Sequence, residues 1–267
     1  MKSLTRTTVV VNFVALLAVL VINYLSNSLP LNGKTPGELS DLYPNYFVPA
    51  GLTFSIWGII YTWLIVWTGY QVAALFSKSM AQKMEPIIAK SNPWFLISCL
   101  LNILWLFAWH WQVLGLSVTV MIALLLTLVK LNLSIQDSTL PVSKLEKNLA
   151  WIPFGIYQGW ITVALIANIT ATLVQEGIFT GSSMEVPIAA MMVAIGALLA
   201  IAVLFRQKNI GHGLAVSWAL FGIYWKQHIL PGSDHQLITY TALAGMAGVL
   251  AVTALKGIEN YRQAPQA

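Results

Sequence analysis

The amino-acid sequence predicts an all-α integral membrane protein with eight transmembrane helices. Of its 267 residues, 58% are hydrophobic and only 9% are charged, whereas an ordinary soluble domain has about 25% charged residues. About 20 apolar residues are enough for one membrane-spanning helix. Eight apolar windows of this length cover residues 7–28, 49–76, 93–110, 114–135, 149–173, 185–205, 212–229 and 236–256. The longest polar stretches between them are expected to form short loops at residues 30–48, 77–92 and 136–148.

The positions of the positively charged residues support this number of spans and predict the orientation. With the N-terminus in the cytoplasm, twelve of the 14 Lys and Arg residues fall on the cytoplasmic side, and only Lys34 and Lys226 fall outside. Cytoplasmic loops of membrane proteins carry an excess of Lys and Arg. With one span more or fewer, the Lys and Arg residues would no longer fall mostly on one side of the membrane. We therefore expect a multi-pass protein of the plasma or inner membrane with both termini cytoplasmic.

The first apolar window, residues 7–28, follows Lys2 and Arg6 as in a signal peptide. Its apolar run continues into INYLSNSLP without a small-x-small cleavage site, so we interpret it as a retained span. The cations that give the net charge of +5 are scattered singly around apolar runs, which argues against a nucleic-acid-binding face. The single cysteine, Cys99, is expected to pack as a small hydrophobic residue.

Three spans carry aromatic and amide side chains at steps of three and four residues, which places each set on one helix face. The sets are Phe54, Trp57 and Tyr61 in the second span, Ser98, Asn102, Trp105 and Trp109 in the third, and Pro153, Tyr157, Trp160, Ala164 and Asn168 in the fifth. The second span is expected to start at Pro49, whose missing N–H costs nothing at a helix start. The small residues Ala50 and Gly51 then leave room for a ligand at its entry.

These side chains also have a purely structural interpretation. Trp and Tyr gather at both membrane interfaces, and an Asn inside a span can hold helices together with about 0.6–2 kcal/mol. These explanations account poorly for a pattern that lies well inside three spans. Flat apolar faces with a few polar groups suit a planar, mostly apolar ligand. We expect Trp57, Trp105 and Trp160 to meet and contact such a ligand, and Asn102 and Asn168 to hydrogen-bond it.

Three motifs in this order resemble the second, third and fifth helices of the translocator protein family, also called tryptophan-rich sensory proteins (TspO/MBR). They are P-A-G-x-x-F-S-I-W-x-x-I-Y at 49–61, L-N-x-x-W at 101–105 and Y-x-x-W-x-x-V-A-x-x-x-N at 157–168. The resemblance covers about residues 1–175. It implies a five-helix bundle, a pocket for tetrapyrroles and other apolar ligands under the first loop, and a link to stress and porphyrin handling.

Together, the stripes and the resemblance define a set of candidate ligand-binding residues, and the resemblance implies a porphyrin- or haem-type tetrapyrrole as the bound group. The candidates are Phe47, Pro49, Ala50, Gly51, Phe54, Trp57, Tyr61, Asn102, Trp105, Trp109, Tyr157, Trp160, Ala164 and Asn168.

The first loop departs from the family pattern, which has tryptophans, a Lys-Pro pair and a Pro-Pro pair there. The positions that differ are Pro44, Asn45, Phe47, Ala50 and Leu52. The family's loop cation is therefore missing, and only Lys34 remains nearby to recognise a ligand carboxylate.

The spans over 185–256 lie outside the five helices of the family. We therefore predict a ligand-binding bundle over residues 1–175, followed by three additional helices and a short cytoplasmic tail over 176–267. The aromatic stripe of these added helices lies toward the outer end of one span, at Ser217, Phe221, Tyr224 and His228. We expect the added helices to carry no part of the main pocket.

The sequence gives little support for catalysis or metal binding. No Asp or Glu lies inside a predicted span, which argues against a proton-coupled carboxylate relay. The four histidines lie at span ends without close ligand spacing, and no nucleophile motif or phosphate-binding loop is present. An enzyme that degrades a bound tetrapyrrole would lack an acid–base residue, so we expect no catalytic residue and no metal site.

The leading interpretation is therefore a binding or sensory protein, with the lipid bilayer and a small apolar ligand as its partners. A homo-oligomer that associates through membrane helices stays open. The alternative is a small-molecule transporter in which the last three helices rock against the first five. Broken helices are typical of such transporters, and Pro153 in an otherwise apolar span is the feature that favours one.

Overall fold

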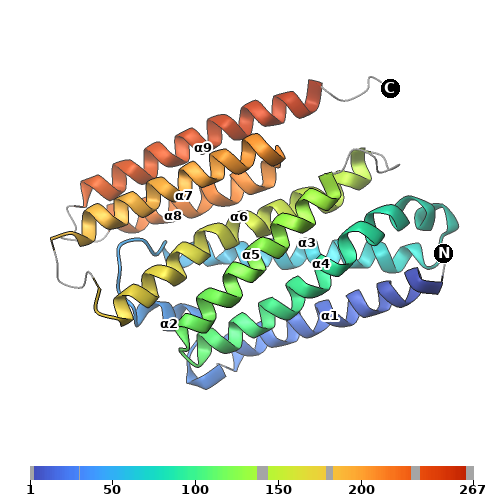
Figure 1. Cartoon of the computed structure of the whole chain (residues 1–267), viewed down its shortest axis with the longest axis horizontal. Helices are drawn as coiled ribbons and strands as arrows, with labels where there is room; N and C mark the ends of the chain where they lie inside the picture. Colours follow the sequence, from blue (N-terminus) through green and yellow to red (C-terminus); the bar gives the residue numbers. More distant parts are fainter. Residues whose placement is uncertain (1–2, 30, 137–143, 179–182, 230–234, 263–267) are drawn as a thin grey trace.

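The computed structural model describes residues 3–29, 31–136, 144–178, 183–229 and 235–262. Within these ranges the chain is helical and contains no strand, as expected for an all-α protein. The long helices form an elongated bundle (Figure 1), and they are α1 (Ser3–Ser28), α3 (Ile56–Ala74), α4 (Lys78–His110), α5 (Leu114–Gln136), α6 (Lys144–Gln175), α7 (Glu185–Gln207), α8 (Ile210–Ile229) and α9 (Gln236–Arg262). The first loop contains a short helix and two 3₁₀ turns, which are α2 (Pro36–Asp41), η1 (Leu31–Gly33) and η2 (Gly51–Ser55).

Seven helices in the described part of the chain are long and apolar enough to cross a membrane. They cover Arg6–Ser28, Gly51–Ala74, Lys78–His110, Leu114–Gln136, Lys147–Gln175, Glu185–Gln207 and Gln236–Arg262. The protein is therefore an integral membrane protein. The eighth expected span, α8, is long enough but less apolar, because it carries His212 near its start and Lys226, Gln227 and His228 near its end. The eighth crossing stays a prediction.

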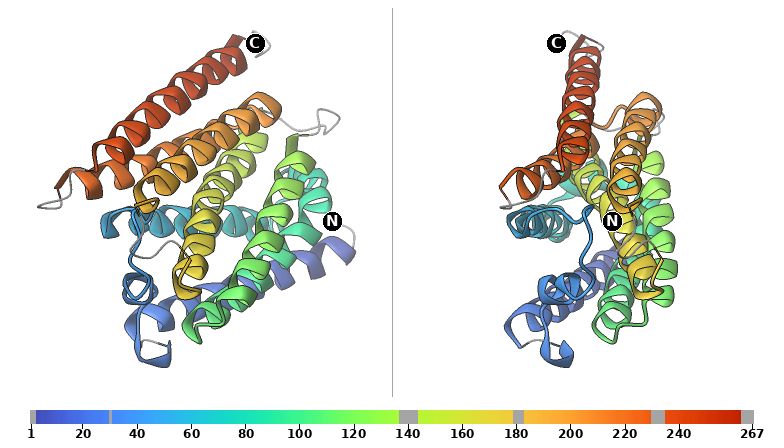
Figure 2. Two further views of the ribbon diagram at one scale, coloured as in Figure 1. Left: turned by 60° about the vertical axis from the view of Figure 1, so that its left-hand side comes forward. Right: turned by 90° about the vertical axis from the view of Figure 1, so that its left-hand side faces the viewer.

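Helix α8 lies inside the C-terminal half of the bundle, where it packs mainly against α6 and α9. Figure 2 shows α9 at one edge, with α7 and α8 between it and α6. Eleven of the 20 residues of α8 are buried. A helix that other helices shield from lipid does not need a uniformly apolar surface, which explains the composition of α8.

The backbones of α6 and α8 approach each other closely. A Cβ atom at Gly159 of α6 would lie 2.5 Å from the carbonyl oxygen of His212 and 3.0 Å from the Cβ of Ala215. Small residues allow this kind of contact between membrane helices. The glycine therefore permits the packing that fixes α8 against the first half of the chain.

The polar stretch 77–92, expected as a loop, is the first half of α4. Ser77 caps this helix and accepts a hydrogen bond from the backbone N–H of Met80 at 3.4 Å. The apolar side chains that follow at helical spacing are buried, and they are Ala81, Met84, Ile87 and Ile88. The loop prediction was wrong because Lys, Gln and Ser residues on the exposed face lower the mean hydropathy of the whole window.

A second correction concerns the start of the second span. Pro49 does not begin a helix, since η2 starts at Gly51 and α3 starts at Ile56. Ala50, directly before η2, has a non-helical backbone and donates its N–H to the carbonyl oxygen of Gly222 in α8 at 3.0 Å. This hydrogen bond to α8 gives the N–H of Ala50 a partner outside its own segment.

The first loop is held over the end of α4. The hydroxyl of Tyr43 donates to Gln112 at 3.1 Å, and the indole N–H of Trp109 donates to the carbonyl oxygen of Pro36 at 3.3 Å. Within the loop, Thr35 and Glu38 form a capping box at the start of α2. The backbone N–H and the hydroxyl of Thr35 both donate to the Glu38 carboxylate, which lowers its pKa below the ordinary value.

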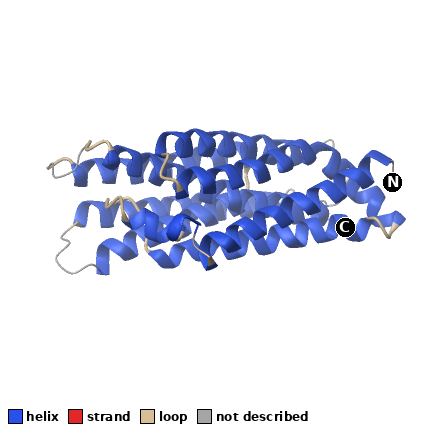
Figure 3. Ribbon diagram, turned by 90° about the horizontal axis from the view of Figure 1, so that it is seen from below, coloured by secondary structure: helices blue, strands red, loops and turns tan. Residues whose placement is uncertain are grey.

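The helices run roughly parallel, with the connecting segments at the two ends of the bundle (Figure 3). Helix α1 begins and α9 ends at the same end (Figure 1). The first loop lies at the opposite end, beside the start of α5 and the end of α6.

Replacing Gly159 by Ala should lower the thermal stability of the protein. The added methyl group would overlap the backbone of α8, and overpacking of this kind costs about 1–3 kcal/mol. Thermal unfolding in detergent measures the effect. Gly69→Ala in α3 is the matched control, because a Cβ there meets no atom within 4 Å. Equal melting temperatures for the two variants would contradict the close α6–α8 contact.

Candidate ligand-binding cavity

A cavity of about 570 Å³ lies under the first loop, enclosed by parts of α1, α2, α3, α4, α5, α6 and α8 and by the segment that leads into η2. This volume is within the range of small-molecule sites. Eleven of the fourteen candidate residues line it, namely Pro49, Ala50, Gly51, Phe54, Trp57, Tyr61, Trp105, Trp109, Trp160, Ala164 and Asn168. The structure therefore brings most of the aromatic stripes from three helices to one surface.

Three tryptophans form the central part of the cavity wall. The ring of Trp57 in α3 lies 6.1 Å from that of Trp105 in α4 at an interplanar angle of 24°. It lies 6.2 Å from the ring of Trp160 in α6 at 83°. The prediction that the three rings meet is confirmed. Two nearly parallel rings and one perpendicular ring form an aromatic corner, and Phe54 packs edge-on against Trp160 at 5.6 Å.

Helical spacing extends this wall along α3 and α4. Tyr61 lies one turn after Trp57 and stacks on it at 5.4 Å, and Trp109 lies one turn after Trp105 at 6.5 Å with an interplanar angle of 21°. Residues four positions apart lie on the same face of a helix. The stripes that the sequence predicted therefore become flat, continuous surfaces in the cavity.

Some polar atoms of the cavity-lining residues have no hydrogen-bond partner among the described residues. They include the indole N–H groups of Trp105 and Trp160 and the side-chain oxygen of Asn168. The amide nitrogen of Asn168 donates to Ser117 at 3.0 Å, so only its oxygen is left unpaired. Buried polar groups without partners are rare and costly. Each of these atoms is itself buried against protein, so none of them faces the open space of the cavity.

Asn102 and Tyr157 lie behind the cavity wall rather than in it. The amide of Asn102 donates to the hydroxyl of Tyr157 at 2.9 Å and accepts from the amide of Asn23 at 2.9 Å. The oxygen of Asn23 in turn accepts from the hydroxyl of Tyr61 at 2.6 Å. This network joins α1, α3, α4 and α6, and it favours the structural interpretation of Asn102. Phe47, the third candidate outside the lining, is buried in the first loop.

The segment that forms the mouth of the cavity is bound to α8 by three hydrogen bonds. The carbonyl oxygens of Tyr46 and Thr53 accept from Gln227 at 2.8 Å and from Trp218 at 3.0 Å. The N–H of Ala50 donates to the backbone of α8, as described above. Gly222 allows this approach, because a Cβ atom there would lie 2.2 Å from the methyl carbon of Thr53. We name the residues 46–53 the mouth segment.

Several lining residues were missed in the sequence, chiefly from α1, the first loop and α8. Asn23 and Asn27 lie near the end of α1, and Ser40 and Asp41 lie in α2. Their helices carry no aromatic stripe that could mark them. Lys226 of α8 also lines the cavity, so the expectation that the last three helices carry no part of it is wrong.

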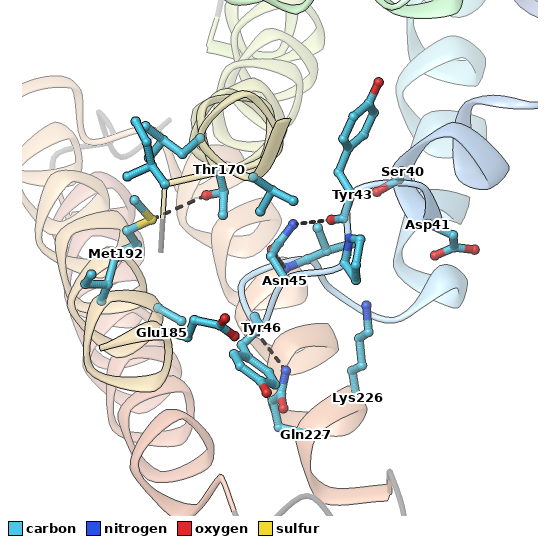
Figure 4. Close-up of a pocket in the computed structure, with 17 residues that line it drawn as sticks. Ser40, Asp41, Tyr43, Asn45, Tyr46, Thr170, Glu185, Met192, Lys226 and Gln227 are labelled. Atoms are coloured by element: carbon cyan, nitrogen blue, oxygen red, sulfur yellow. Dashed lines mark hydrogen bonds between the residues drawn. The ribbon is translucent and has the colours of Figure 1, made fainter. Parts of the chain in front are cut away.

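A second cavity of about 400 Å³ lies on the other side of the first loop, between the end of α6, the start of α7 and the end of α8. Figure 4 shows its lining, with Asn45 of the loop on the side of Thr170 of α6 and Met192 of α7, and with the ring of Tyr43 pointing away from them. The two cavities share Ser40, Asp41, Val48 and Lys226. The first loop and Lys226 therefore form the boundary between the two spaces.

These features define a multi-pass helical membrane protein with an aromatic-lined cavity beneath its first loop. The chain belongs to the TSPO-like protein family, whose model matches residues 9–255. The family resemblance of the sequence is thereby confirmed, and the match extends beyond residue 175 through α7 and α8 and into α9. Comparisons with curated proteins and with solved structures give no match.

Replacing Asn102 by Leu should lower thermal stability even when no ligand is present. The substitution would leave the amide of Asn23 and the hydroxyl of Tyr157 short of a partner, and each buried unpaired group costs about 1–3 kcal/mol. Thermal unfolding with and without protoporphyrin IX measures the effect. An unchanged melting temperature without ligand, with a loss only of the stabilisation by ligand, would instead identify Asn102 as a ligand contact.

Proposed function

We propose that this protein is a membrane-embedded binding or sensory protein for a planar apolar ligand, with a tetrapyrrole such as a porphyrin as the best candidate. The observation that carries this proposal is the aromatic corner of Trp57, Trp105 and Trp160 inside a cavity of small-molecule size. Membership of the TSPO-like family supports it.

The geometry of the corner favours a flat ligand. A planar conjugated ring can stack along the nearly parallel surfaces of Trp57 and Trp105 while its edge meets the face of Trp160. A ligand with a broad apolar face would suit this surface.

The transporter interpretation loses the feature that favoured it. Helix α6 continues through Pro153 as one helix from Lys144 to Gln175, so the proline does not break it. Flux across reconstituted vesicles remains the measurement that separates transport from binding.

We further propose eight crossings with both termini in the cytoplasm and the lipid bilayer as the surrounding partner. Helix α1 begins and α9 ends at the same end of the bundle (Figure 1), which supports an even number of crossings. The asymmetry of twelve cations against two supports the orientation. In this arrangement the cavity opens toward the outer side of the membrane.

Fusing a topology reporter after Gln263 tests the orientation. We expect activity from a reporter that works in the cytoplasm, because α8 adds the eighth crossing. A reporter after Lys34 is the matched control and should be active only on the outer side. A C-terminal fusion active only outside the cytoplasm would contradict the proposed topology.

Replacing Trp105 by Leu should weaken binding of protoporphyrin IX by roughly three- to tenfold. This range follows from the loss of an aromatic contact worth about 0.5–1.5 kcal/mol, at 1.4 kcal/mol per tenfold change. Titration of the purified protein, followed by tryptophan quenching corrected for the lost fluorophore, measures the effect. Trp111→Leu is the control, because Trp111 is 53% exposed and does not line the cavity.

The Leu variants of Trp57 and Trp160 complete this test. If all three variants bound protoporphyrin IX as tightly as the wild type, the proposed site would be wrong.

A further inference from the structure

We infer that Lys226 recognises an anionic group of the ligand, so that the ligand is a planar apolar molecule with a carboxylate. This inference rests on the proposed function, because it assigns the ligand class to the same cavity. It also gives α8 a direct part in binding.

The first observation is the distribution of charge in the larger cavity. Among its described lining residues, Lys226 and Asp41 are the charged ones. They come from the last turn of α8 and from α2 in the first loop, whereas the aromatic corner of Trp57, Trp105 and Trp160 comes from α3, α4 and α6. A ligand that fills this cavity therefore meets both aromatic rings and charge, as an amphiphilic molecule requires.

The second observation is the position of the Lys226 ammonium group. Figure 4 shows the side chain extending from α8 toward α2 and Asp41. The two charges interact electrostatically, but within the described residues no ion pair or hydrogen bond engages the ammonium nitrogen. An ammonium group has three N–H donors, and a carboxylate that accepts from it forms a strong, charge-assisted hydrogen bond.

The environments of the two charged groups favour an anionic ligand over a cationic one. Asp41 is exposed, whereas Lys226 is half-buried between the first loop and α8. A charge interaction is weaker in high-dielectric surroundings and stronger where water is excluded. A ligand carboxylate at Lys226 therefore gains more than a ligand cation at Asp41. Asp41 itself repels such a carboxylate, which gives the two residues opposite predicted effects.

Lys226 thereby supplies the cation that the first loop lacks. Lys34, the cation that remains in that loop, lines neither of the two cavities. The chain thus provides a matched control, since Lys34 and Lys226 are the two cations of the proposed outer side.

The test compares protoporphyrin IX, which has two carboxylates, with its dimethyl ester, which has none. Binding of both is measured with the wild-type protein in lipid nanodiscs. We expect the acid to bind about tenfold more tightly than the ester, at the lower end of the range for a hydrogen bond to a charged group because the site is half-exposed. This preference should decrease as salt screens the charges.

The variants separate the roles of the two charges. Lys226→Met should remove the preference for the acid over the ester, whereas Lys226→Arg should keep the preference. Asp41→Asn should strengthen binding of the acid about threefold and leave the ester unchanged, because a repulsive charge is lost. Lys34→Met should behave as the wild type. Melting temperatures check that each variant is folded, and Lys226→Gln replaces the Met variant if that one is not.

Equal binding of acid and ester by the wild type, or an undiminished preference in the folded Lys226→Met variant, would overturn the inference while leaving the proposed function intact. A loss of the preference for the acid in Lys34→Met equal to that in Lys226→Met would also overturn the local charge argument. If neither porphyrin bound the wild type, the proposed function would fail and the inference with it.

Discussion

The mouth segment, residues 46–53, is irregular backbone that ends in the first residues of η2, and its polar groups need hydrogen-bond partners. Irregular backbone in a membrane protein is tolerated only where protein or a water-filled cavity satisfies those groups. Here α8 provides the partners through Trp218, Gln227 and the backbone of Gly222. The shape of the cavity depends on this arrangement, because the mouth segment leads directly into the helix that carries Trp57.

The same constraint explains why α8 carries polar residues at both ends. Its polar end faces the first loop rather than lipid, and its other end joins a second buried network. There, the amide of Asn209, just before α8, donates to Asn132 of α5 at 3.0 Å and to the backbone of Trp151 in α6 at 2.6 Å. Asn132 also donates to Gln158 at 2.8 Å. Hydrogen bonds near both ends of α8 thus tie it to the first half of the chain.

Patterns within a single segment of sequence predicted the features that lie within a single helix. Aromatic residues at steps of three and four marked the cavity-facing sides of α3, α4 and α6. Hydropathy predicted eight spans, and seven of them are long apolar helices in the described part of the chain. Contacts between distant segments could not be predicted this way. Asn102 was expected to bind a ligand because its partner Asn23 is 79 positions away. Lys226 was overlooked as a cavity residue because nothing near it in the sequence shows that α8 reaches the first loop.

A structure determined with protoporphyrin IX bound in a lipid bilayer tests the central claim most directly. The account predicts the macrocycle in the cavity beneath the first loop, in contact with Trp57, Trp105 and Trp160, with the mouth segment still bonded to α8. A macrocycle bound instead to the lipid-facing surface of the helices, with the cavity filled by lipid or by rearranged side chains, would contradict it.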